Sequence, residues 1–115
     1  MMNFKTEKPW GYFEILNSGK NYIVKKILVS PGGILSLQSH NHRSEHWIVV
    51  EGEAEVSVDK VTSNLKENES IYIPKGAIHR IANKKNHNLI IIEIWYGDKL
   101  DENDIKRYED IYKRI

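Results

Sequence analysis

Residues Gly32 to Gly52 read GGILSLQSHNHRSEHWIVVEG, and this stretch decides how the chain folds. Positions 38–46 contain three histidines, a glutamate and a glutamine, and a fourth histidine, His79, occurs in the later segment IPKGAIHRIAN. Buried imidazole and carboxylate groups each need a polar partner. This concentration therefore favours a binding site, and the alternative is that several of these histidines are structural and bind no metal.

The segments on either side of this stretch have the spacing of short β-strands. Apolar, β-branched runs such as Tyr22–Val29 and Leu89–Tyr96 are separated by turns rich in Gly, Pro and Asn. Regular strand spacing with such turns is typical of sandwiches and barrels. We predict an all-β chain of about nine short antiparallel strands, a number that comes from counting such runs.

The tail has a different pattern. Asp101 is a suitable N-cap, and apolar residues follow it at helical spacing: Ile105, Tyr108, Ile111, Tyr112 and Ile115. This pattern predicts a short amphipathic C-terminal helix. Small barrels often bury an edge strand against a second copy, so we also predict a homodimer in which this helix takes part.

Composition narrows the function. The 115 residues contain no cysteine and carry a formal net charge of +1, so any metal must be held by nitrogen and oxygen ligands, and nucleic acid is not an expected partner. No apolar run approaches the roughly 20 residues needed to cross a bilayer. We expect a single domain over residues 1–115, in the cytoplasm and without a membrane partner.

Strand geometry indicates which candidate ligands can converge. Side chains two positions apart share a face, which aligns Gln38, His40 and His42. Glu45 is out of phase and joins them only if the chain turns within residues 41–44, a polar stretch suited to a turn. His79 would then close the site from another strand. Such ligands suit a divalent ion of zinc, manganese, iron, cobalt or nickel.

Two motifs carry a resemblance to a known family. Gln38-x-His40-x4-Glu45-x6-Gly52, followed by Pro74-x-Gly76-x2-His79-x3-Asn83, resembles the two motifs of the cupin superfamily, a small jelly-roll barrel. KPWGYFEIL, YIVKKILVSPGG and NESIYIPKGAIHRIAN extend the likeness over nearly the whole chain. It is most similar to the C-terminal cupin domain of type II mannose-6-phosphate isomerases.

This resemblance implies the interconversion of mannose 6-phosphate and fructose 6-phosphate by a metal-dependent site. The superfamily register implies the metal ligands Gln38, His40, Glu45 and His79, whereas strand parity gives His40, His42, Glu45 and His79. Candidates for moving the proton are His42 and His46, with Arg80 as a further catalytic candidate. Candidates for binding the phosphate are Arg43, Arg80 and Lys26.

Members of that family are usually fused to a mannose-1-phosphate guanylyltransferase, whose glycine-rich phosphate loop has no counterpart in these residues. We therefore expect no guanylyltransferase activity, and a separately encoded nucleotidyltransferase is a candidate partner. Two other functions stay open: a non-catalytic module that binds sugar phosphates, and a metal cupin that acts on another small metabolite.

Overall fold

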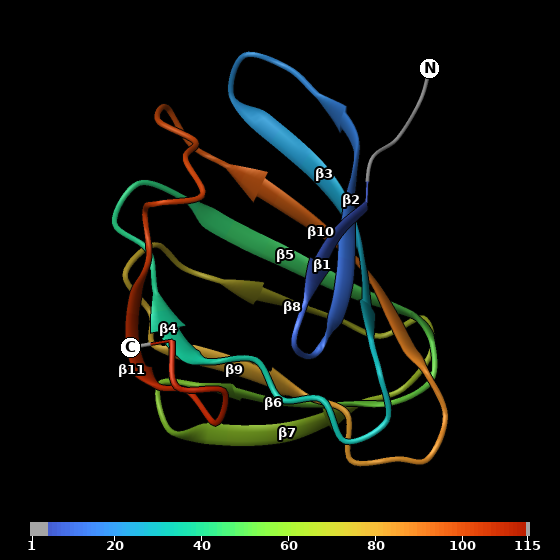
Figure 1. Ribbon diagram of the computed structural model, residues 1–115. Coiled ribbons are helices and arrows are strands. Elements are labelled where there is room, and N and C mark those ends of the chain that lie inside the picture. Colours follow the sequence, from blue (N-terminus) through green and yellow to red (C-terminus); the bar gives the residue numbers. More distant parts are fainter. Residues whose placement is uncertain (1–4, 115) are drawn as a thin grey trace.

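The computed structural model describes residues 5–114, which form eleven strands and no helix, arranged as two facing antiparallel sheets (Figure 1). The six-stranded sheet has the order β1 (Lys5–Lys8), β2 (Gly11–Ser18), β3 (Tyr22–Val29), β10 (Leu89–Tyr96), β5 (Ser44–Glu51), β8 (Ser70–Ile73). The five-stranded sheet has the order β11 (Lys106–Glu109), β4 (Leu37–Ser39), β9 (His79–Ala82), β6 (Ala54–Val58), β7 (Val61–Leu65). The predicted all-β jelly roll is confirmed. None of the described residues belongs to a helix that could span a bilayer.

One end of the space between the sheets is filled by aliphatic side chains. The register places Leu89 of β10 opposite Val29 of β3, and Ile91 opposite Val49 of β5. Burying each such side chain contributes about 1.5–3 kcal/mol. We call this region the apolar end, and its residues are at most 1% exposed: Val29, Val49, Val56, Ile81, Leu89 and Ile91.

The other end of the interior is polar, although the same strands build it. Moving along β10, Glu93 and Trp95 continue the inward face that Leu89 and Ile91 begin, and the register pairs Glu93 with Lys25 and Trp95 with Glu45. We call this region the polar end, defined by five buried side chains: Lys25, Glu45, His79, Glu93 and Trp95.

The predicted C-terminal helix is wrong. The described part of the tail forms turns followed by β11, which pairs with β4 at the edge of the five-stranded sheet and runs past one end of the barrel (Figure 1). Asp101 Oδ1 accepts a hydrogen bond from the Asn103 N–H at 2.9 Å, as an N-cap does, but the chain makes one turn and then pairs with β4 as a strand. Ile115 lies outside the described residues. The homodimer stays a prediction, without a helix to support it.

Candidate metal centre and adjoining cavity

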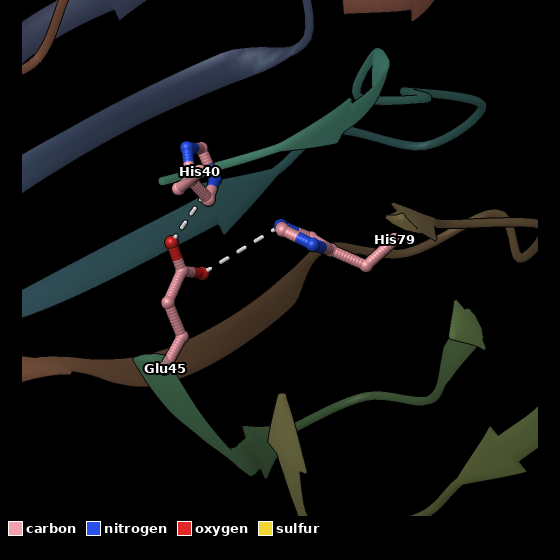
Figure 2. A group of neighbouring side chains, drawn as sticks. All are labelled: His40, Glu45 and His79. Carbon is pink, nitrogen blue, oxygen red and sulfur yellow. Dashed lines mark ion pairs between the residues drawn. The ribbon is translucent and has the colours of Figure 1, made fainter. Parts of the chain in front are cut away.

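Three buried side chains from separate segments converge at the polar end: His40, Glu45 and His79. One ligand atom from each lies within 4.8 Å of those from the other two. Figure 2 shows the Glu45 carboxylate between the imidazoles, with Oε2 3.2 Å from His40 Nε2 and Oε1 3.9 Å from His79 Nε2. The convergence predicted for these three residues is present.

The hydrogen bonds of the two histidines fix how their rings are protonated. His40 Nδ1 lies 2.7 Å from the Asp104 carbonyl oxygen, and His79 Nδ1 lies 3.0 Å from that of Ala77. A carbonyl oxygen only accepts, so Nδ1 carries the proton in each ring and Nε2 presents a lone pair toward Glu45. Burial lowers the pKa of His40 to about 4, and it also lowers the pKa of His79. Two neutral imidazoles and a carboxylate fit a divalent metal ion.

The loop between β4 and β5 brings Glu45 into the cluster. The chain bends at Asn41 and His42, where the Asp104 carboxylate accepts both backbone N–H groups at 2.9 Å. Gly97 packs against this bend so closely that a Cβ there would lie 2.1 Å from the His42 carbonyl oxygen. The turn required by strand parity therefore exists, and the tail holds it.

Gln38 also faces the polar end. Its Cα is the register partner of His79, and its side chain lines the adjoining cavity. The amide Nε2 donates to Ser36 Oγ at 3.0 Å, which leaves the amide oxygen as the group available to a metal ion. His42 is half-buried and is not among the residues that line the cavity. The placement thus favours the ligand set with Gln38 over the one with His42.

Arg43 lies inside the cluster rather than at its rim. Its Nε donates to Glu45 Oε2 at 2.8 Å, and its Nη2 lies 3.2 Å from His40 Nε2. The guanidinium carbon sits 3.4 Å from the centre of the Trp95 ring, a cation–π contact. Sequence reasoning placed a cation here but did not anticipate that a metal-ligand candidate would be its partner.

A cavity of about 230 Å³ adjoins the cluster. Ligand pockets commonly measure about 300–1,000 Å³, so this volume suits a small metabolite. Among the described residues, six cationic side chains line it: Lys8, Lys25, Arg43, Arg80, Arg107 and Arg114. Three carboxyl groups line it too: Glu45, Glu93 and Glu102. Arg80 and Arg114 are paired with carboxylates that do not line the cavity, and the four remaining cations still outnumber the three carboxyl groups, which indicates an anionic ligand.

The sequence prediction named Lys26 as a phosphate ligand, but the inward lysine is its neighbour. Lys25 is 2% exposed, forms an ion pair with Glu102 and lies 3.6 Å from the centre of the Trp95 ring. Burial lowers the pKa of Lys25, against the opposing effect of Glu93 and Glu102. Lys26 is half-buried and does not line the cavity. Strand parity with the core residues of β3 was the signal that identifies Lys25.

Glu93 is a second residue that sequence reasoning missed. It is the lone charged residue in the run LIIIEIWY, and it accepts a hydrogen bond from Trp95 Nε1 at 2.6 Å. Burial, followed by the negative charge of Glu45, raises the pKa of Glu93 to about 8. The group therefore holds a proton at neutral pH. The sequence signal that could have identified Glu93 is a single acidic residue at an inward-facing position of an otherwise apolar strand.

Two further candidates lie away from the metal-ligand cluster. His46 is exposed on the opposite face of β5, where its ring packs 4.8 Å from that of Tyr72. Arg80 lines the cavity but is held by its neighbours, donating from Nε to the Leu35 carbonyl oxygen at 3.0 Å and lying 3.6 Å from the Glu109 carboxylate. The structure thus brings Arg80 to the cavity and leaves His46 outside it.

Two facing antiparallel sheets that enclose a histidine–carboxylate cluster define a small barrel of the cupin class. An RmlC-like cupin from Shewanella frigidimarina NCIMB 400 shares this fold, with a TM-score of 0.76 and 22% identity over 88% of this chain and 87% of that chain. The profile of the family described as "Mannose-6-phosphate isomerase C-terminal" matches residues 1–110. The chain belongs to this family, as its motifs predicted.

Curated relatives are much longer than this chain. The alginate biosynthesis protein AlgA of Pseudomonas aeruginosa is 50% identical over 107 residues, covering 93% of this chain but 22% of its own length. The mannose-1-phosphate guanylyltransferase ManC of Salmonella typhimurium is 45% identical over 114 residues, covering 99% of this chain and 24% of its own length. The chain thus spans about a quarter of such proteins.

Proposed function

We propose that this chain is a metal-dependent sugar-phosphate isomerase that interconverts mannose 6-phosphate and fructose 6-phosphate in the cytoplasm. One observation carries the proposal: the His40–Glu45–His79 cluster opens onto a small cavity with twice as many cationic side chains as carboxyl groups. A metal site suits the carbonyl and hydroxyl oxygens of a sugar, and a cationic cavity beside it suits the phosphate group. Membership in the isomerase family supports the choice of reaction.

Two groups of residues would act in this reaction, one that holds the metal and one that supplies positive charge. Gln38, His40, Glu45 and His79 would hold a divalent metal, which supplies a Lewis acid for the carbonyl and hydroxyl oxygens of the sugar. Lys25 and Arg43 place fixed positive charge beside this cluster, where negative charge develops on the substrate during isomerisation. Because Phe13 and Trp95 cover the Lys25 ammonium, water screens this charge little.

A coupled assay that starts from mannose 6-phosphate tests the proposal. Protein stripped by chelation should show no turnover, and re-addition of single divalent metals should restore it. Glu45→Gln serves as the matched inactive variant, since it replaces the carboxylate between the two histidines with an isosteric amide. No turnover above blank with metal-loaded wild-type protein would refute the isomerase. Calorimetric binding of the sugar phosphate without product would instead support a non-catalytic binding module.

A further inference from the structure

The C-terminal segment contributes one side chain to the inner face of the barrel in direct register with the candidate metal centre. Arg107 of β11 is the Cα partner of Gln38 of β4, and Gln38 is in turn the partner of His79 of β9. Directly opposed residues of antiparallel strands place their side chains on the same face. The three therefore form a row across the five-stranded sheet, and all three line the cavity.

Arg107 differs from the other arginines near the outer part of this cavity. Arg80 is paired with the Glu109 carboxylate, and Arg114 is paired with that of Asp110. The Nε of Arg107 is buried and has no hydrogen-bond partner among residues 5–114. A buried donor without an acceptor destabilises a fold, so its presence at a cavity wall calls for an acceptor supplied by a ligand.

The local backbone directs this side chain. The register of β11 against β4 shifts between Arg107 and Glu109, which leaves Tyr108 as an extra residue in the strand. Bulges of this kind re-aim side chains and are common next to active sites. Tyr108 bonds Ser39 Oγ at 3.0 Å, and this contact anchors the bulge while Arg107 keeps its inward register.

We propose that Arg107 binds the terminal phosphate of the sugar phosphate. A guanidinium group matches phosphate oxygens through paired N–H donors. At about 4.8 Å per strand, the backbone of Arg107 lies about 10 Å from that of His79. A ligand that spans this row has its phosphate at the end remote from the carbon held near the metal centre. The assignment rests on the proposed function and selects sugars phosphorylated at the chain end opposite the carbonyl.

The test uses metal-loaded protein and two readouts, calorimetric binding and coupled turnover, on wild type and on Arg107→Gln and Arg107→Lys. Lys106→Gln is the matched control, because Lys106 precedes Arg107 on the same strand, is exposed and lies over the Tyr108 ring. We expect Arg107→Gln to weaken mannose 6-phosphate binding at least tenfold and to raise KM more than it lowers kcat. Arg107→Lys should recover part of the loss, and Lys106→Gln should stay within twofold of wild type.

Four outcomes bear on the phosphate site, and the first two separate it from the isomerase proposal. If folded Arg107→Gln, checked by its melting temperature, binds mannose 6-phosphate as tightly as wild type, the phosphate site is overturned whether or not turnover occurs. If wild type binds the ligand through Arg107 without turnover, the isomerase is overturned and the phosphate site stands. If wild type binds neither mannose 6-phosphate nor inorganic phosphate, both are overturned. Equal losses for unphosphorylated mannose and mannose 6-phosphate would also overturn the site.

Discussion

The apolar and polar ends of the barrel are built by the same strands and differ in what fills successive inward positions. On β3 the inward residue changes from Val29 to Lys25, and on β5 it changes from Val49 to Glu45. Aliphatic burial at one end stabilises the fold, whereas buried ionisable groups at the other reduce stability unless they are paired. Four residues of strand are thus enough to separate the part that holds the barrel together from the part that contains the candidate metal centre.

The sharpest test of this separation uses two residues of β9 that lie two positions apart. His79→Ala should lower metal affinity at least 100-fold and abolish turnover, because it removes one nitrogen ligand from the cluster. Ile81→Ala should destabilise the protein by about 2–5 kcal/mol, because Ile81 is 1% exposed and packs in the apolar end. It should keep metal affinity, because Ile81, although it also lines the cavity, offers no ligand atom. Competition with a chromophoric chelator and urea unfolding measure the two effects.

The separation of the two ends is contradicted if His79→Ala mainly lowers stability and Ile81→Ala mainly lowers metal affinity, or if each variant lowers both. A folded His79→Ala protein with wild-type metal affinity would exclude His79 as a ligand. An Ile81→Ala protein that loses metal while keeping its stability would show that the two ends are not independent.

The polar end should also make the stability of metal-free protein depend on pH. The folded-state pKa of His40 is about 4 against an ordinary 6.5, so between these values the unfolded chain holds a proton that the folded protein lacks. The contribution of His40 to the free energy of unfolding is therefore fully present above pH 6.5. It falls by about 1.4 kcal/mol per pH unit below that value, or by about 3 kcal/mol in total. His79, whose pKa is also lowered, acts in the same direction.

Glu93 acts in the opposite direction, since its raised pKa favours the folded state at low pH. The measurement is therefore made by urea unfolding of chelator-treated Glu93→Gln protein between pH 6.5 and 4. A matched Glu93→Gln/Ile81→Ala protein should show the same pH slope from a lower starting stability. A flat profile between pH 6.5 and 5 would contradict the buried, neutral state of His40.

Much of the polar end is predictable from sequence because the signals are local. Alternation along strands and the polar bend after His40 predict that His40, Glu45 and His79 converge, and the structure brings them together. The all-β architecture follows from strand spacing in the same way. Gln38 was distinguished from His42 by family resemblance, since strand parity alone gives both the same face.

Two features were not predicted correctly from the sequence: the structure of the tail and the lysine that faces the cavity. The tail has helical spacing, but its turns are stabilised by local side-chain bonds of Asp101 and Asp110 and by pairing with β4, which a periodicity argument does not include. Lys25 and Lys26 are chemically identical neighbours, so only the phase of β3 separates them. That phase was readable from Ile27, a buried residue two positions from Lys25.

This pair of lysines provides the next test. Lys25→Met should lower kcat/KM for mannose 6-phosphate at least tenfold, because it removes a buried charge from the cavity while keeping a side chain of similar length. Lys26→Met should stay within twofold of wild type. Steady-state kinetics and melting temperatures of both proteins measure the difference. Equal effects would contradict the assignment of Lys25 to the polar end, and a larger effect of Lys26→Met would restore the prediction made from sequence.

The smallest expected effect concerns how the tail supports the cluster from outside. Partial burial acts to raise the pKa of Asp104, but the N–H groups of Asn41 and His42 outweigh it and hold the pKa below its ordinary value, so the carboxylate is charged at neutral pH. Asp104→Ala removes both bonds and should lower metal affinity about tenfold, the low end for residues that orient ligands. Excess metal should restore turnover, because the ligands themselves are intact.

Asp104→Asn keeps one acceptor and should lie between wild type and alanine, whereas Asp98→Ala, in an exposed position before the tail turns, should match wild type. Chelator competition on the four proteins ranks them. If Asp104→Ala binds metal as wild type does, the bend at residues 41–42 holds itself, and the tail contributes to the site through Arg107 and the Asp104 carbonyl alone. If the predicted ranking holds, the tail, whose sequence pattern wrongly predicted a helix, sets the geometry of the bend at residues 41–42, whose pattern predicted the site.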